Sequence, residues 1–266
     1  MRIIQISGWS GSGKTTFILG LLEVLSRLGT VGTIKHIGDH ICDLPAGKDT
    51  TLHYLAGASV SIGIDQKRTL ITRDSLSLFD ALDMLADTGV EYAVVEGFKQ
   101  VPFRKVVIGD LNLPCLIRDP TIEGVITHLN EFDEYSTLGG LVSTAQKSMS
   151  HPGGDEPGKR PGDGVILSSI CWYGAGIKTR DSYDLSLSES SYSQFMRTAH
   201  ILGTQALALP GQLDVRISLK CRVFSLPVPV YVVVAGEPHL AGPAFSHCMK
   251  GISHLCRSGG DDLHQD

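Results

Sequence analysis

The 266-residue sequence lacks a surplus of basic residues, a long apolar run and a tight cysteine pattern. Lysine and arginine total 23 against 28 aspartate and glutamate residues, a balance that argues against a nucleic-acid partner. No apolar run approaches the ~20 residues of a membrane-spanning helix, which argues against a membrane protein. The six cysteines are scattered, and the apolar residues 1–6 run directly into a glycine-rich turn. We therefore expect reduced thiols and a cytoplasmic protein.

The sequence does contain two stretches of different pattern, separated by a segment rich in proline, glycine and charge. Strand and helix signals alternate through residues 1–147, which predicts an α/β domain with a doubly wound sheet of the P-loop NTPase type. Residues 148–163 predict a flexible linker. Residues 164–256 mix strands and helices without strict alternation and predict a smaller α+β domain. Residues 257–266 are polar and predict a disordered tail.

Hydrophobic periodicity predicts the individual elements. Strands of the first domain are expected at 2–7, 31–36, 92–96, 106–108 and 115–117, with a hairpin from 60–65 and 69–72. Its helices are expected at 16–28, at 76–86 with Asp74 or Ser75 as the cap, and over 122–145. In the second domain, strands are expected at 165–170, 183–187, 215–221 and 228–235, and helices at 190–207 and 243–255.

The strongest motif is a P-loop between the first expected strand and the first expected helix. It consists of Gly8, Trp9, Ser10, Gly11, Ser12, Gly13, Lys14, Thr15 and Thr16. The glycines let successive backbone amides point at phosphate oxygens. Lys14 would neutralise the β- and γ-phosphates, and the Thr15 hydroxyl would ligate Mg²⁺. A plain strand-to-helix turn is the alternative, but such a turn does not require Lys-Thr at its end. The motif therefore predicts a site for GTP or ATP.

A magnesium site of this kind needs a second acidic group at the end of a neighbouring strand. Glu96 is the best candidate, because it ends an apolar strand and so reaches the edge of the sheet where ligands collect. The alternative is an ordinary strand-terminating acid. Asp49 is a weaker candidate, and Lys48 could add charge at the phosphates. A solvated surface pair is the other interpretation of Lys48 and Asp49.

Two groups of residues could suggest a further metal site, but neither has the tight, fixed spacing of known zinc sites. The first group is His36, His40, Cys42 and Asp43. The second group is His247, Cys248, His254 and Cys256. We interpret the first as loop residues that serve a partner or the phosphates, and the second as structural residues.

Four motifs together resemble MobB, the molybdopterin-guanine dinucleotide biosynthesis adapter family. They lie at residues 8–16, at 32–36, at 47–49 with 56–58, and at 94–99. The resemblance covers about residues 1–145 and implies a GTP-binding, weakly hydrolytic homodimer. It also implies that the protein assists molybdopterin guanylyltransferase, which attaches GMP to molybdopterin, or other molybdenum-cofactor enzymes. One departure is Ala46, which precedes Gly47 where the family often has proline.

The second domain is similar to MoaE, the large subunit of molybdopterin synthase. The similarity lies at residues 164–167, 215–221, 232–239 and 244–245. The family's His-Arg pair becomes His239-Leu240, and Cys256 stands about where a catalytic lysine is expected. Sulfur transfer onto an anionic pterin needs such cations. We therefore expect an inactive domain used for docking or dimerisation, with an unrelated α+β domain as the alternative.

The leading hypothesis is thus a GTP-binding adapter with slow hydrolysis, since no residue stands out as a strong water-activating group. GTP is preferred over ATP on the family resemblance alone. A small-molecule kinase is the alternative, but Arg68, Arg73 and Arg104 are too scattered to form its phosphate lid. A third hypothesis is a bifunctional enzyme whose second domain is an active molybdopterin synthase subunit. The absence of the family's lysine and arginine at the expected positions argues against it.

Overall fold

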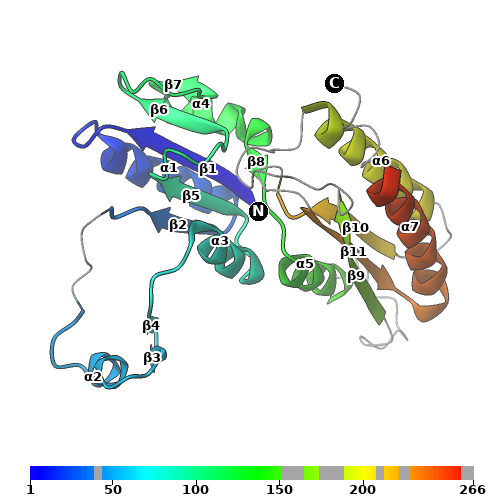
Figure 1. Cartoon of the computed structure of the whole chain (residues 1–266), viewed down its shortest axis with the longest axis horizontal. Helices are drawn as coiled ribbons and strands as arrows, with labels where there is room; N and C mark the ends of the chain where they lie inside the picture. Colours follow the sequence, from blue (N-terminus) through cyan, green and yellow to red (C-terminus); the bar gives the residue numbers. More distant parts are fainter. Residues whose placement is uncertain (39–43, 151–164, 174–188, 208–212, 222–227, 259–266) are drawn as a thin grey trace.

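The computed structural model describes residues 1–38, 44–150, 165–173, 189–207, 213–221 and 228–258. Within these residues the chain forms two units that lie side by side (Figure 1). The first has a mainly parallel sheet with helices on both faces, and the second has a three-stranded antiparallel sheet. The predicted α/β fold with a smaller domain of mixed strands and helices is therefore confirmed.

The parallel sheet has the strand order β2-β5-β1-β6-β7. Its strands are β1 (Arg2–Gly8), β2 (Val31–Lys35), β5 (Tyr92–Glu96), β6 (Lys105–Ile108) and β7 (Ile117–Arg118). All neighbours in this order run parallel, so their carboxyl ends meet at one edge. A short strand, β8 (Asp133–Glu134), pairs antiparallel with the first residues of β1. The loop after β1 therefore lies at the centre of the edge where ligands bind in such folds.

Different helices cover the two faces of this sheet, because side chains alternate along a strand. On one face Ile4 packs against α1 (Lys14–Leu28) and α4 (Ile122–Thr127). On the other face Ile3 packs against α3 (Leu78–Asp87). Strands β1, β5 and β6 are buried on both faces, which explains their nearly continuous apolar sequence.

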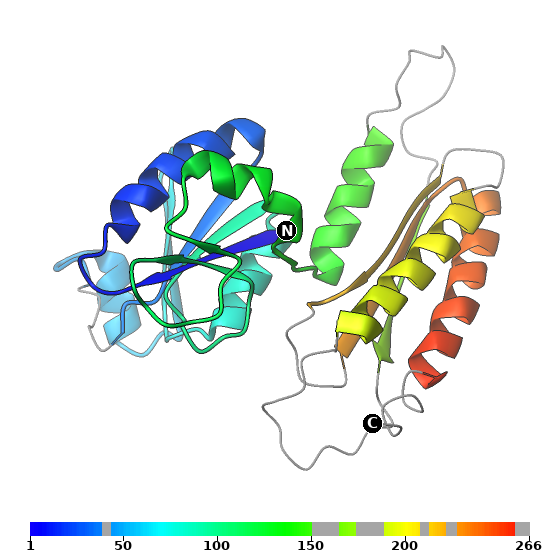
Figure 2. The same ribbon diagram turned by 90° about the horizontal axis from the view of Figure 1, so that it is seen from above.

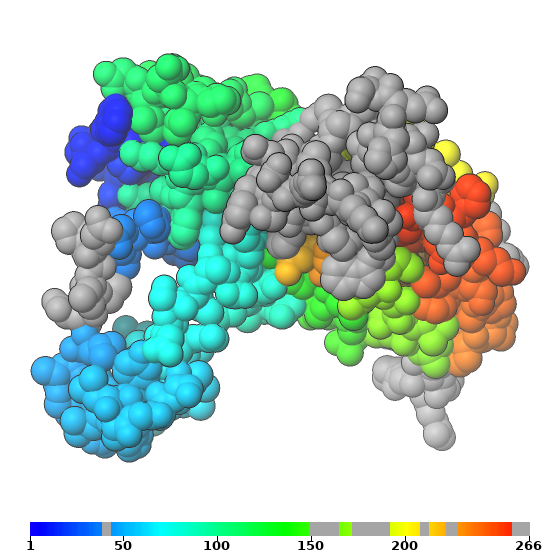
Figure 3. Space-filling model, viewed as in Figure 1, coloured from blue at the N-terminus to red at the C-terminus, as the bar shows by residue number. Residues whose placement is uncertain are grey.

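An arm formed by residues 44–74 projects from the first unit between β2 and α3 (Figures 1 and 3). Its elements are α2 (Asp49–Leu55), β3 (Val60–Ile64) and β4 (Thr69–Arg73). Strands β3 and β4 pair antiparallel with each other, which confirms the predicted hairpin. In the turn between them, Asp65 Oδ1 accepts hydrogen bonds at 2.6 Å from the backbone amides of both Lys67 and Arg68.

The second unit is a sheet of order β10-β11-β9 between two layers of helix. Its elements are α5 (Leu138–Ser150), β9 (Val165–Tyr173), α6 (Glu189–Leu207), β10 (Leu213–Leu219), β11 (Val228–Gly236) and α7 (Pro238–Ser258). Figure 2 shows α5 on one face of the sheet and α6 and α7 on the other. Accordingly, Val232 and Val234 of β11 belong to the core with α6 and α7, whereas Val233 packs with α5.

The prediction of one helix over residues 122–145 is wrong. Helix α4 ends at Thr127 and is followed by a 3₁₀ turn, η1 (Leu129–Glu131), by β8 and then by α5. The reason lies in Phe132 and Tyr135, which are buried on opposite faces of the first sheet. Residues three apart on a helix share one face, so a helix could not bury both in this way. Helix α5 then packs Ala145 against the second sheet, not the first.

Smaller corrections concern element ends. Helix α3 is capped by Ser77, not by Asp74 or Ser75, and Ser77 forms a capping box with Asp80. Residues 148–150 end α5 instead of starting the linker, and residues 257–258 end α7 instead of starting the tail. The rest of the predicted linker, the strand predicted at 183–187 and residues 259–266 lie outside the described residues. Of the helices described, none has the length and apolarity needed to cross a membrane.

The two units are joined through residues that follow β8 and β10. Tyr135 and Cys221 form an isolated antiparallel bridge, and the Ser136 amide donates to the Lys220 carbonyl at 2.8 Å. The Tyr135 hydroxyl donates to Asp83 Oδ1 at 2.7 Å, and Lys220 Nζ donates to Asp83 Oδ2 at 2.7 Å. Burial, followed by the hydrogen bond to Asp83, raises the pKa of Tyr135. A carboxylate on α3 therefore binds side chains from both connections.

Candidate nucleotide-binding site

The loop between β1 and α1 has the backbone that a P-loop requires. Gly11 and Gly13 have φ values of 76° and 83°, in the left-handed region that favours glycine. A Cβ atom on Gly8 would lie 2.7 Å from the carbonyl oxygen of Ile108 and 2.7 Å from Ser12 Oγ. The three glycines are therefore needed for the fold of the loop, as the motif predicts.

Helix α1 begins at Lys14 without a side-chain cap. The backbone amides of Lys14, Thr15 and Thr16 lie in its first turn, where helix amides have no intrahelical acceptor and attract anions. Ser10 and Thr15 are exposed. Ser12 Oγ is buried and has no hydrogen-bond partner among the described residues. Open amides beside an unpartnered hydroxyl suit a ligand with several acceptor oxygens, such as a phosphate chain.

The Lys14 ammonium group lies at the same loop. Its Nζ donates to the carbonyl oxygen of Trp9 at 2.5 Å, so the side chain folds back over the loop instead of extending into solvent. Lys14 is thus placed at the first turn of α1, beside the amides that would bind phosphate.

Glu96 reaches the edge of the sheet, as predicted. It ends β5, its Cα is paired with those of Ile6 on β1 and Lys35 on β2, and its side chain is 15% exposed. Lys35 Nζ lies 3.5 Å from Glu96 Oε2. The Thr15 hydroxyl and the Glu96 carboxylate are both hard oxygen donors, so this donor set fits Mg²⁺. It does not fit a soft metal.

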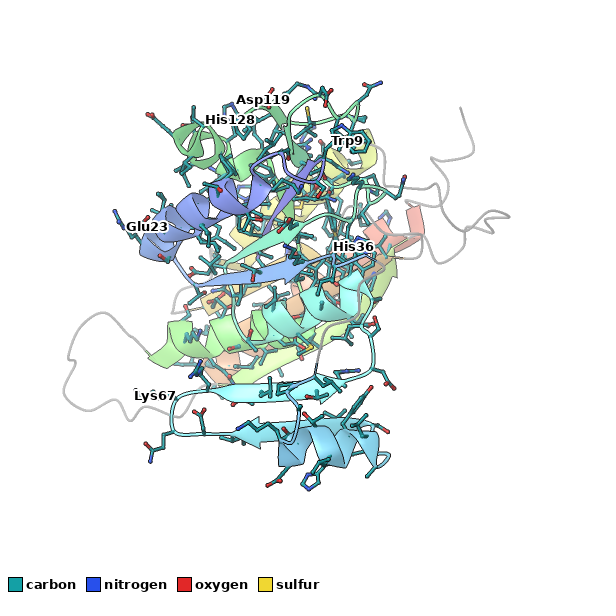
Figure 4. The ribbon with its side chains drawn as sticks, turned by 90° about the vertical axis from the view of Figure 1, so that its left-hand side faces the viewer. Trp9, Glu23, His36, Lys67, Asp119 and His128 are labelled. Carbon is teal, nitrogen blue, oxygen red and sulfur yellow. The ribbon has the colours of Figure 1, made fainter. Side chains whose placement is uncertain are left out.

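Lys48 and Asp49 lie elsewhere in the chain. Asp49 begins α2 and Lys48 precedes it, and both are exposed in the arm. In Figure 4 helix α2, which Asp49 begins, lies at the bottom of the view, far from the labelled Trp9 near the top. The structure therefore brings together the P-loop residues and Glu96, but it does not bring Lys48 and Asp49 to them.

The first group that could have suggested a metal site can be examined only at His36, because His40, Cys42 and Asp43 lie outside the described residues. The His36 ring lies 4.7 Å from the Phe98 ring, and its backbone amide donates to the Glu96 carbonyl at 2.9 Å. Across the described ranges, no group of three or more His, Cys, Asp and Glu side chains could hold a metal ion.

Comparison with known proteins finds matches to part of this chain. Residues 3–127 match the family model described as molybdopterin guanine dinucleotide synthesis protein B, MobB. Over this stretch the chain resembles the MobB family. The match includes β1, the P-loop, the arm and Glu96, and it ends before β8 and the whole second unit.

Individual relatives also resemble part of the chain. An Escherichia coli protein described as a molybdopterin-guanine dinucleotide biosynthesis adapter protein is 33% identical over 113 residues, 40% of this chain and 64% of that protein. A Bacillus subtilis relative is 36% identical over 113 residues, with the same coverage of 40% and 64%. A crystal structure of Bacillus subtilis MobB covers 48% of this chain and 98% of its own, with 25% identity and a TM-score of 0.40. The chain spans between about half and two thirds of the length of the curated relatives it matches.

Sequence reasoning noted the motif at residues 94–99 but did not predict the geometry of the turn that it forms after β5. Phe98 has a φ of 49°, unusual for a residue with a side chain, and it follows Gly97 with a φ of 94°. The buried Gln5 side chain donates to the carbonyl oxygens of Gly97 at 2.8 Å and Phe98 at 2.7 Å. The polar Gln5, which lies between the apolar residues Ile4 and Ile6 in β1, was the signal that could have pointed to this turn. The turn leads to Lys99, whose Nζ lies 4.6 Å from the centre of the Trp9 ring.

Proposed function

We propose that this chain is a GTP-binding adapter of molybdenum cofactor biosynthesis, which assists attachment of GMP to molybdopterin and hydrolyses GTP weakly. One observation carries the proposal. A loop with the glycine backbone of a P-loop has Lys14 at its end and Glu96 at the end of the neighbouring strand, and it lies within the part of the chain that matches the MobB family. The family match supports a role in molybdenum cofactor biosynthesis. The loop geometry supports the binding of a nucleotide.

In this proposal the amides at the start of α1 bind the phosphate oxygens, and Lys14 exchanges the Trp9 carbonyl for the β- and γ-phosphates. Thr15 and Glu96 would hold Mg²⁺, which supplies charge neutralisation at the phosphates when it is bound. Glu96 is already paired with Lys35. We assign Glu96 to cation binding, in which Mg²⁺ would take the place of Lys35 at the carboxylate, and we expect slow hydrolysis because the sequence offers no strong water-activating group.

The arm is the surface that we propose for the homodimer. Its strands carry apolar side chains that the described part of the chain leaves exposed: Ile64 is 80% exposed and Ile62 is 56% exposed, and Leu55 of α2 is 68% exposed. Such a patch marks an interaction site. A second copy of the same arm offers a matching surface. Because Lys48 and Asp49 lie in the arm, a role for them at the phosphates requires contact across the two subunits.

The second unit, in our proposal, is a MoaE-like docking domain without synthase chemistry. Cys256 stands about where the family's catalytic lysine is expected, and its side chain is partly buried in the core of α6, α7 and the sheet. Burial, with a smaller effect of Cys171, raises the pKa of Cys256 to about 12. The residue therefore remains a neutral thiol near pH 7 and cannot replace an ammonium group at an anionic substrate.

The proposal is tested by reconstituting GMP attachment with a purified molybdopterin guanylyltransferase, with and without this chain. We expect the wild-type chain to raise the yield of molybdopterin-guanine dinucleotide, and Lys14→Ala to lose the effect. Transfer of phosphate from the nucleotide to a small molecule, with no effect on guanylylation, would establish a kinase instead. Sulfur transfer to a pterin precursor by the full chain would contradict the docking role of the second unit.

A further inference from the structure

A second lysine lies at the phosphate loop, supplied by the turn after β5. Lys99 Nζ is 4.6 Å from the centre of the Trp9 ring, and Trp9 is the second residue of the loop. Trp9 is 54% exposed and Lys99 is half-buried, so solvent screens part of the contact between the ring and the cation and weakens it. A charged phosphate oxygen is a much stronger partner for an ammonium group. The Trp9 ring therefore keeps Lys99 close to the loop without binding it tightly.

The backbone that carries Lys99 is fixed by two buried side chains. The Gln5 amide, fully buried, holds the Gly97 and Phe98 carbonyls. Lys105, 5% exposed, donates from its Nζ to the Lys99 carbonyl at 3.0 Å and to the Val101 carbonyl at 2.7 Å.

This turn also stores backbone strain. Phe98, between the two held segments, keeps a positive φ that costs free energy unless its surroundings enforce it. A strained turn fixed by buried polar side chains, with a half-buried lysine at its end, is typical of a preorganised ligand contact.

The position of the turn indicates which phosphate Lys99 would meet. Lys14 approaches from the start of α1, whereas Lys99 approaches from the β5 side of β1, the side that also carries Glu96. Glu96 in turn is paired with Lys35, so its charge is shared with another cation. Lys99 is thus an additional positive charge beside the predicted magnesium ligands, where the terminal phosphate of a bound triphosphate would lie.

We propose that Lys99 is a second phosphate-binding cation, which contacts the terminal phosphate and makes the site prefer a nucleoside triphosphate to a diphosphate. This inference rests on the proposed nucleotide site, and it names Lys99 as the residue that distinguishes a nucleotide with a γ-phosphate from one without. On phosphate binding, Lys99 leaves the Trp9 ring, so a change at Trp9 accompanies triphosphate but not diphosphate.

The test measures binding of a non-hydrolysable GTP analogue and of GDP to the full chain by calorimetry with Mg²⁺. We expect Lys99→Ala to weaken binding of the analogue about tenfold and binding of GDP less than twofold. Lys99→Arg restores the preference, and Lys250→Ala, an exposed lysine change on α7, leaves both affinities unchanged. Lys14→Ala weakens both ligands strongly. In a Trp172→Phe background, the analogue changes Trp9 emission, and Lys99→Ala removes that change.

Two results overturn the inference and differ from each other. If Lys99→Ala weakens both ligands equally, or neither, while Lys14→Ala weakens both, the nucleotide site stands and the role of Lys99 is wrong. If Lys14→Ala leaves both affinities unchanged, the phosphate loop is not the site, and the proposed function fails together with the role of Lys99.

Discussion

Replacing Asp83 tests how the two units of the chain are held together. Asp83 on α3 accepts one hydrogen bond from the Tyr135 hydroxyl and one from Lys220 Nζ, each at 2.7 Å. Tyr135 is fully buried, and the Lys220 side chain is 15% exposed. Asp83→Ala therefore leaves a buried hydroxyl and a poorly solvated ammonium group without their shared carboxylate.

The magnitude follows from these two bonds. A hydrogen bond to a charged group contributes about 1.5–3 kcal/mol. The Asp83 side chain is 34% exposed, so solvent screens part of the ion pair and the lower end of that range applies. We expect Asp83→Ala to lower the free energy of unfolding by about 3 kcal/mol, and Tyr135→Phe to lower it by about 1.5 kcal/mol. Because both changes remove the same bond, the double variant should lose about 1 kcal/mol less than the sum.

The assay is urea unfolding followed by far-UV circular dichroism, with free energies obtained by linear extrapolation. Thr144→Ala, an exposed change on α5, serves as the control for handling and expression. A loss below about 0.5 kcal/mol for Asp83→Ala would refute the reasoning, because that is the ordinary range for surface substitutions. Strict additivity of the two changes would also refute it, because the two side chains would then not share a bond.

Three further predictions concern backbone strain at glycine, the cap of α3 and the pH dependence of stability. Gly13→Ala should destabilise the chain by about 1–2 kcal/mol, because Gly13 has a positive φ. Gly203→Ala, at an open position inside α6, should stabilise the chain by about 0.5–1 kcal/mol. Equal effects of the two changes in urea unfolding would contradict this. Ser77→Ala should lower the stability of α3 by about 1 kcal/mol and Ser75→Ala should not, as thermal unfolding can check. Burial lowers the pKa of Lys105, so between that lowered pKa and the ordinary lysine value of about 10.4 the unfolded chain binds more protons, and stability rises with pH. Lys105→Met should flatten this rise, and an unchanged pH profile would show that Lys105 does not cause it.

The sequence predicted the parts of the fold whose signals are local. The strand at residues 92–96 was placed with its exact ends, because it is a short apolar run closed by Glu96. The glycine-rich turn between the first strand and the first helix was also placed correctly, because its glycines are required by the backbone of one loop.

The errors arose where distant partners decide the structure. Residues 122–145 have helical periodicity, yet Phe132 and Tyr135 are buried on opposite faces of the sheet and interrupt it. Helix α5 looked like the end of the first domain, although Ala145 packs against Val233, far along the chain. The motif at residues 94–99 included Lys99, but its place beside Trp9 depends on the positive φ of Phe98, which Gln5 holds from a distant part of the chain.

The account depends most directly on whether the loop from Gly8 to Thr15 binds a nucleotide. Thermal unfolding of the full chain with GTP, ATP and Mg²⁺ measures this, since a ligand that binds only the folded state raises the melting temperature. We predict a rise with GTP and Mg²⁺ that exceeds the rise with ATP and that disappears in Lys14→Ala. A melting temperature unchanged by either nucleotide, or a rise that Lys14→Ala leaves intact, would contradict the account.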